Sequence, residues 1–423
     1  MVSIFSRRMA AALLTAPALL WAADAPPLSL AGAVQLAVAQ SRLMDAGGLQ
    51  ASAAREMAVA AAQLPDPVLK LGINNFPVTG NERFSLARDF MTMRSVGVMQ
   101  EFSREDKRRA RSSRYEKEAE ASDANRALTL NNVQRGTAMA WLERYYQERM
   151  LAQLTRQRDE AGLQTDAADA AYRGGRGSQS DVFAARMAVA QIEDRIAMAE
   201  RQVATASTQL ARWVGEAAAQ SLSGLPSMDA VHLQEAGLEA QLMHHPQIAL
   251  MAKQEEVAQA DADIARANKT ADWSTELMFS QRGSAYANMI SINVSVPLQW
   301  DPKNRQDREL AAKLATAEQL RAEREDALRA HAAEVRALLQ EWKGNRARLK
   351  RYDESTVPLS AERTQAAVAA YRGGGGASGG TLGAVLEARR GELDVRMERL
   401  RLEMDTARLW VQLNYLTSSG EQP

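Results

Sequence analysis

The chain has 423 residues, with 52 basic and 52 acidic side chains, so its formal net charge is zero. This balance argues against a nucleic-acid partner, because phosphate binding needs a net basic face. Cysteine is absent, which excludes disulfides, thiolate metal sites and a lipidated N-terminal cysteine. Alanine, leucine, glutamate and arginine dominate the middle of the chain, a composition typical of long helices and coiled coils.

Residues 1–23 predict a secretory signal peptide. Arg7 and Arg8 precede an apolar run over residues 9–21 that ends in small residues. The run is shorter than the ~20 residues of a membrane span, and an uncleaved membrane anchor is the alternative. No later stretch is apolar and long enough to cross a bilayer as a helix, so a mature protein in the membrane must use strands.

The chain is predicted to contain an internal repeat. Ala-Tyr-Arg-Gly-Gly at residues 171–175 recurs at 370–374, and Ser-Val-Gly-Val at 95–98 matches Ser-Ile-Asn-Val at 291–294. A helix, two strands, a very long helix, a glycine-rich turn and a return helix are expected in each half. We therefore expect two repeats with these bounds: 24–224 and 225–423.

The helices are predicted from their apolar periodicity. The first helix of each half spans residues 31–62 or 238–268, and the long helices span 104–172 and 303–371. Each long helix would measure roughly 100 Å at about 1.5 Å per residue. Pro358 should kink the second one or mark an irregularity in it. The return helices carry heptad seams typical of coiled coils, for example Val189, Ile196, Val203 and Leu210, and Leu386, Leu393, Leu400 and Ala407.

Four short segments alternate apolar and polar residues, which predicts strands. Residues 290–298 show the clearest alternation, and 69–74, 96–98 and 277–279 are the others. Aromatic residues flank them, as at the interfaces of membrane barrels: Phe76, Phe84, Phe90, Trp273, Tyr286 and Trp300. Membrane barrels need about eight strands or more, so several chains would share one barrel. An ordinary sheet with one wet face in a soluble domain is the alternative.

This duplicated plan resembles the TolC family of outer-membrane efflux proteins over essentially the whole mature chain. The two Tyr-x-x-Gly turns carry the resemblance most strongly. The segment 84–94, leading into 98–102, resembles the heavy-metal branch of the CzcC and CusC type.

The resemblance implies a mostly α fold with a small membrane β part. Long helical hairpins would form a periplasmic α-barrel, and three chains would each give four strands to a 12-stranded β-barrel in outer-membrane lipid. The chain would form a homotrimer. Its other partners would be a periplasmic adaptor and an inner-membrane pump of the resistance-nodulation-division class. The expected function is a metal-exporting duct, not an enzyme, and no cofactor is expected. Multidrug efflux, type I secretion or a periplasmic coiled-coil adaptor are the alternatives.

The glycine-rich turns are expected to form the periplasmic mouth. The resemblance implies adaptor docking at Tyr172, Gly174, Gly175, Tyr371, Gly373 and Gly374, although plain hairpin turns explain the glycines equally well. It also implies a gate with Glu387, Arg372, Asp181 and Arg173. The arginines would pair with carboxylates of a neighbouring helix, and Asp181 favours a capping role at its helix N-terminus.

No metal site is expected. The four histidines are His232, His244, His245 and His331, and the pair at 244–245, just before Pro246, lacks a carboxylate or histidine partner at metal-ligand spacing. Met91, Met93 and Met99 raise the alternative of soft Cu(I) or Ag(I) ligation, but packing and loop lining explain them as well and are favoured here. No nucleophile with a base, phosphate loop or carboxylate pair is evident.

Overall fold

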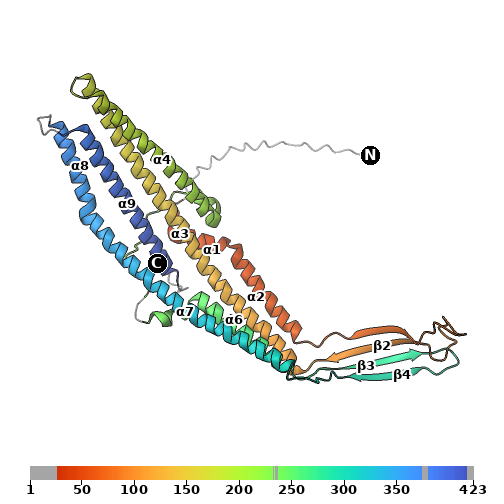
Figure 1. Ribbon diagram of the computed structural model, residues 1–423. Helices are drawn as coiled ribbons and strands as arrows, with labels where there is room; N and C mark the ends of the chain where they lie inside the picture. Colours follow the sequence, from red (N-terminus) through yellow and green to blue (C-terminus); the bar gives the residue numbers. More distant parts are fainter. Residues whose placement is uncertain (1–25, 232, 234–236, 374–379, 417–423) are drawn as a thin grey trace, which may run out of the picture.

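The computed structural model describes residues 26–231, 233, 237–373 and 380–416. The predicted signal peptide and Gly374 lie outside them. The molecule is an elongated helical body with a four-stranded sheet projecting from one end, and the helical hairpins end at the opposite pole (Figure 1).

The order helix, two strands, long helix and return helix occurs twice. The first half comprises α1 (Leu30–Gln40), α2 (Arg42–Ala61), β1 (Val68–Asn74), β2 (Met93–Phe102), α3 (Glu105–Arg173), α4 (Gln179–Val214) and a 3-10 turn at Gly215–Ala219. The second comprises α5 (Leu238–Leu242), α6 (Pro246–Ala267), β3 (Trp273–Gln281), β4 (Met289–Ser295), α7 (Gln306–Arg351), a π-helix at Tyr352–Thr356, α8 (Val357–Arg372) and α9 (Leu382–Asn414).

The first helix of each half is broken, whereas one continuous helix was predicted. Ser41 has an extended backbone and separates α1 from α2. In the second half Pro246 is the first residue of α6, and proline cannot continue a preceding helix because it lacks an N–H and clashes with the turn before it.

The predicted long helices are confirmed with small shifts at their ends. Helix α3 has 69 residues, so it is about 100 Å long at 1.5 Å per residue. Its counterpart runs through α7 and α8 and contains a π-helical turn directly before Val357 and Pro358. The predicted irregularity at Pro358 is therefore confirmed: the wider turn accommodates a residue that has no N–H to donate.

The sheet has the order β1-β2-β3-β4 with antiparallel neighbours throughout. Leu69 pairs with Val98, Val98 with Leu277, and Leu277 with Ile292. Because side chains alternate along each strand, this register places apolar residues of all four strands on one face.

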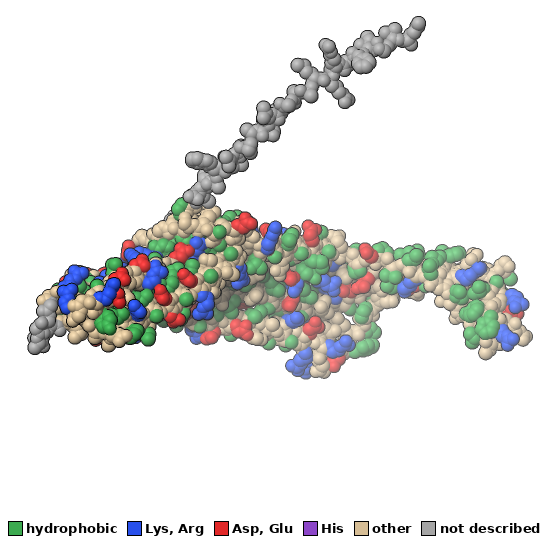
Figure 2. Space-filling model, turned by 90° about the horizontal axis from the view of Figure 1, so that it is seen from above, with side chains coloured by type: hydrophobic (Ala, Val, Ile, Leu, Met, Phe, Trp, Pro, Cys, Tyr) green, Lys and Arg blue, Asp and Glu red, His purple; other side chains and the backbone are tan. Residues whose placement is uncertain are grey.

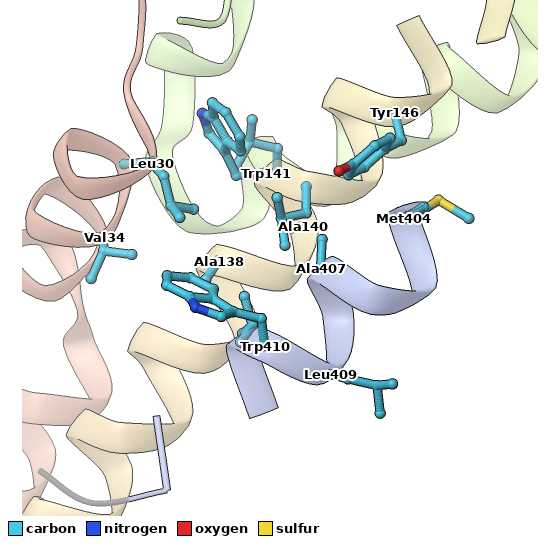
Figure 3. Close-up of a cluster of buried hydrophobic side chains, with 14 of the residues drawn as sticks. Leu30, Val34, Ala138, Ala140, Trp141, Tyr146, Met404, Ala407, Leu409 and Trp410 are labelled. Atoms are coloured by element: carbon cyan, nitrogen blue, oxygen red, sulfur yellow. The ribbon is translucent and has the colours of Figure 1, made fainter. Parts of the chain in front are cut away.

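The core lies in the middle of the helical body. Residues of α1, α3 and α9 meet there, including Val34, Trp141, Tyr146 and Trp410 (Figure 3). The Trp141 indole donates to the Leu28 carbonyl at 3.0 Å, and the Trp410 indole donates to the Ala230 carbonyl at 2.8 Å. Both buried N–H groups thus have a hydrogen-bond partner, as buried polar groups require. The two bonds also link connecting segments to the long helices.

Candidate functional site

The two faces of the sheet differ in chemistry and in exposure. One face carries Leu71, Phe279, Ile290 and Ile292, and Leu71 is 73% exposed. No helix covers the sheet in the described part of the chain (Figure 1). Few charged side chains lie over the strands, whereas they crowd the helical body (Figure 2). An uncovered apolar face of this extent needs an apolar environment or a partner.

The opposite face is polar and more covered. Ser95 and Ser280 are buried at 8% and 4% exposure. The Lys70 ammonium lies 2.8 Å from the Glu276 carboxylate, across strands β1 and β3 on this face. Because successive side chains of each strand point to opposite sides, the sheet has one apolar face and one polar face.

Both edges of the sheet are free. Within the described residues β1 pairs only with β2, and β4 pairs only with β3. Each edge strand has seven residues and carries exposed apolar side chains. Open edges of this kind leave backbone N–H and C=O groups unpaired and are templates for pairing with another chain.

Asp181 has the capping role expected of it. Its carboxylate accepts from the Ser178 N–H at 3.0 Å, and its own N–H donates to the Ser178 hydroxyl at 3.1 Å. This reciprocal arrangement is a capping box that begins α4.

Within the described chain, neither arginine of the tips makes the expected ion pair with a carboxylate of another helix. Arg173 lies 3.0 Å from Asp169 of its own helix, four residues back, where side chains share a face. Arg186 of α4 approaches the same carboxylate at 4.0 Å. Arg372 has no ion-pair partner among the described residues.

Glycine is required at particular places in the tips. Gly175 has a φ of +70°, which side chains rarely adopt. A Cβ at Gly177 would lie 3.2 Å from the Ala171 Cβ, and one at Gly380 would lie 2.9 Å from the Ala370 Cβ. The turns are thus tight enough to favour glycine at Gly175, Gly177 and Gly380, whereas Gly174 and Gly373 have negative φ values.

The tips of the two hairpins share a small apolar cluster. It consists of Ala168, Val182, Ala185 and Leu382, and Tyr371 packs against it. Tyr172, at the matching position of the first half, is 44% exposed instead. The two tips are therefore in contact within one chain but are not equivalent.

Glu387 lies on the first turns of α9. Its carboxylate is 3.2 Å from the Arg363 guanidinium of α8, and its side chain is 77% exposed. It also lines a hollow of about 350 Å³ between α3, α4 and α9, next to Leu386 and Arg390. Arg363 is a functional candidate that the sequence did not indicate.

Ion pairs between the hairpins were also missed. Arg389 of α9 pairs with Glu160 of α3, and the Arg195 guanidinium of α4 lies 2.8 Å from the Asp394 carboxylate of α9. Their partners are far apart in the sequence, so no local spacing indicates them. These pairs hold α9 against the first hairpin below the tips.

The histidines show one contact that sequence spacing did not indicate. The rings of His245 and His331 have centroids 4.3 Å apart. In the described part of the chain, however, no group of three or more His, Cys, Asp or Glu side chains is arranged to hold a metal ion. None of the helices in the described ranges is long and apolar enough to cross a membrane.

The fold is similar to that of several solved membrane-protein structures. No family model and no curated protein matches the chain. A membrane protein from Pseudomonas aeruginosa matches with a TM-score of 0.77 and 17% identity, over 92% of this chain and 90% of that one. The outer-membrane protein VceC of Vibrio cholerae gives 0.73 and 17%, over 93% and 97%. CusC gives 0.74 and 17%, over 92% of both chains.

These matches define a class of fold. The chain has the architecture of outer-membrane channels: long helices with a four-stranded antiparallel sheet per chain. The outer-membrane channel OprN matches with a TM-score of 0.75, and CusC, at 0.74, is not distinguished from it. The expected fold class is thereby confirmed, whereas the heavy-metal branch is not resolved.

Proposed function

We propose that this protein is the outer-membrane exit channel of a tripartite efflux system. The four-stranded sheet carries the proposal, because it has one exposed apolar face and two free edges. Open edges do not persist in lipid, where every backbone polar group needs an internal partner. Three copies that join β1 to β4 would remove all edges and form a 12-stranded barrel.

The helical hairpins would then form a hollow α-barrel in the periplasm. A periplasmic adaptor would dock at the tips, and a pump of the resistance-nodulation-division class in the inner membrane would supply the energy. Transport, not catalysis, is the expected activity. The internal repeat, 24–224 and 225–423, would give each chain two similar hairpins for this wall.

Heavy-metal cations are the proposed cargo. The resemblance of residues 84–102 to the heavy-metal branch supports this choice, and drugs or secreted proteins are the competing cargoes. A periplasmic adaptor is the rival from another class, but a single-hairpin adaptor with soluble β domains would not account for two hairpins and an uncovered apolar sheet face.

The gate is proposed to lie at the tips. Three copies of Glu387 around the channel axis would make a ring that attracts cations. Arg372 would narrow the mouth by pairing with a carboxylate of the adjacent chain, and Asp181 and Arg173 would support the tip from the first hairpin.

Cysteine pairs across the free edges test the assembly. Within one chain β1 and β4 are three strand spacings apart, about 14 Å, which is too far for a disulfide with its Cα separation of roughly 4.4–6.8 Å. The chain has no native cysteine, so Gly72→Cys combined with Ser291→Cys gives a clean background.

We expect a short bifunctional thiol reagent to link the double variant into covalent trimers in outer-membrane fractions. Gly72→Cys alone should give no covalent trimers, because one cysteine per chain can link at most two chains. A double variant that stays monomeric and fractionates with soluble periplasmic proteins would overturn the proposal.

A further inference from the structure

The polar face of the sheet carries methionines from three of its strands. Met93 and Met99 of β2, Met278 of β3 and Met289 of β4 alternate with apolar residues of the other face. The apolar face, in contrast, holds Leu, Ile, Val and Phe, with Arg94, Gln100, Thr275 and Gln281 towards its ends, and no methionine in these strands. Apart from Val68, methionines are the only large apolar side chains on a face made mainly of serine, glycine and asparagine.

Three of these methionines form a diagonal row, which we name the thioether ladder: Met99, Met278 and Met289. Met99 pairs with Glu276, two residues before Met278 on the same strand. Met278 pairs with Ser291, two residues after Met289. Diagonal neighbours of this kind are about 7–8 Å apart, within reach of long side chains.

The ladder climbs the sheet from the helices towards the far loops. Met99 lies near the end of β2, just before α3 begins, and Met289 begins β4 at the loop end. Each step along a strand covers two residues, about 6.8 Å. The row therefore follows the direction in which cargo would leave the channel.

The lower end of the ladder opens into a hollow that contains carboxylates. This hollow measures about 580 Å³ and is lined by Met99, Glu101 and Asp272, among others. The Asp272 carboxylate is paired with the Lys107 ammonium at 3.0 Å. Glu101 is exposed and lies on the same face as Met99, so a carboxylate adjoins the first thioether.

Packing against a helix does not explain these methionines. Methionine usually fills irregular gaps in a core, but no helix covers the sheet in the described residues. Met289 is 45% exposed, whereas Met99 and Met278 are partly buried among the side chains of the sheet itself. A thioether is a soft ligand that selects Cu(I) over hard cations, and the chain holds no cysteine that would compete.

We infer that the thioether ladder is a series of weak sites for a soft monovalent cation, Cu(I) or Ag(I), on the luminal face of the channel. The inference rests on the proposed function and assigns its cargo class. Sites in series suit transport, because a conducting path must bind an ion firmly enough to admit it and weakly enough to release it.

The test uses Ag(I), which needs no reductant, with the full-length protein in detergent. Methyl-¹³C methionine labels report each thioether by NMR during titration with silver nitrate in chloride-free buffer. We expect the methyl signals of Met99, Met278 and Met289 to shift together, before those of methionines on the helices. Sodium and Zn(II) at the same concentrations should not shift them.

Two matched triple variants sharpen the result. Met99→Leu/Met278→Leu/Met289→Leu removes the ladder and nearly keeps its volume, whereas Met57→Leu/Met187→Leu/Met198→Leu removes exposed methionines of α2 and α4. We expect at least a tenfold loss of Ag(I) affinity in the first variant and none in the second. Equal affinity in both variants, or uniform shifts of all methionines, would overturn the inference.

Trimer formation and conductance in planar bilayers separate this inference from the proposed function. If both persist while the ladder shows no preference for Ag(I), only the cargo assignment fails. If the wild-type protein is monomeric and gives no conductance, the channel itself is refuted.

Discussion

The buried histidine at the start of α6 predicts a pH-dependent opening of that helix. His245 is 5% exposed, and its Nδ1 accepts from the Gln247 N–H at 3.2 Å, which caps the helix. Burial lowers the pKa of His245 from 6.5 to about 4, with smaller contributions from the nearby His331 ring and Arg135. The Glu334 carboxylate lies 3.4 Å from the His331 ring.

The sign of the effect follows from which state binds the proton. Between pH 6.5 and 4 the opened segment takes up a proton at His245 that the closed segment does not, so closure weakens as the pH falls. At pH 5 the loss is about 2 kcal/mol, or roughly 30-fold in the opening equilibrium. Protonation at Nδ1 also removes the acceptor that caps α6.

Hydrogen exchange measures this opening directly. We expect amides in the first turn of α6 to lose about 30-fold protection between pH 8 and pH 5, after correction for intrinsic exchange rates. His245→Asn keeps a good capping side chain that does not titrate, so its protection should change much less. Equal losses in the wild type and the variant would refute this reasoning, as would an unchanged wild type.

Sequence reasoning predicted the elements that have strong local signals. The heptads gave α4 the right type of element, because burial on one face of a helix imposes a period. The alternation over 290–298 gave β4, which ends earlier at Ser295, because successive side chains of a strand point to opposite faces. Pro358 predicted an irregularity in the second long helix because proline lacks a donor wherever it stands, and the structure shows this irregularity as a π-helical turn. The break at Ser41 was missed, since serine is tolerated inside helices and no other residue there disfavours one.

The candidate site was less predictable because its contacts are long-range. Asp181 could be assigned as a cap, since an acidic residue suits a helix N-terminus, whereas its partner Ser178 was not predicted. Arg363 and Glu387, in contrast, meet only once α8 and α9 pack, and nothing local indicates their contact. The thioether ladder depends on strand register across two repeats, which three methionines seen singly do not define.

Two further predictions concern packing and buried charge. In α3, Gly136→Ala should destabilise the protein by about 1–3 kcal/mol, because the new Cβ would lie 2.6 Å from a carbon of Trp213. Gly162→Ala in the same helix has open space and should stabilise it by up to ~1 kcal/mol, as thermal unfolding would show. Asp272→Ala should cost about 3–5 kcal/mol, because its lysine partner is only 7% exposed. Asp394→Ala should cost under about 1 kcal/mol, because the Asp394–Arg195 ion pair is more exposed. A larger loss of unfolding free energy for Asp394→Ala than for Asp272→Ala in denaturant unfolding would contradict this reasoning.

The gate hypothesis predicts that two substitutions change cation selectivity in opposite directions. The Glu387 carboxylate is partly neutralised by Arg363 at 3.2 Å, and both side chains are largely exposed. Glu387→Ala should therefore weaken cation selectivity in planar bilayers, whereas Arg363→Ala should strengthen it by freeing the carboxylate. Arg372→Ala should raise conductance, because it removes the proposed ion pair with the adjacent chain that narrows the mouth.

Asp181→Asn is the matched control for these measurements. Asparagine retains an oxygen that accepts from the Ser178 N–H, so the tip should keep its shape while one charge per chain is lost. None of these residues lies on a heptad seam, so trimers should form in every variant. Opposite changes at Glu387 and Arg363, with little change at Asp181, would locate the selective ring on α9. Equal selectivity in all variants would place it elsewhere, because an ion passing within a Debye length of three carboxylates must respond to their removal.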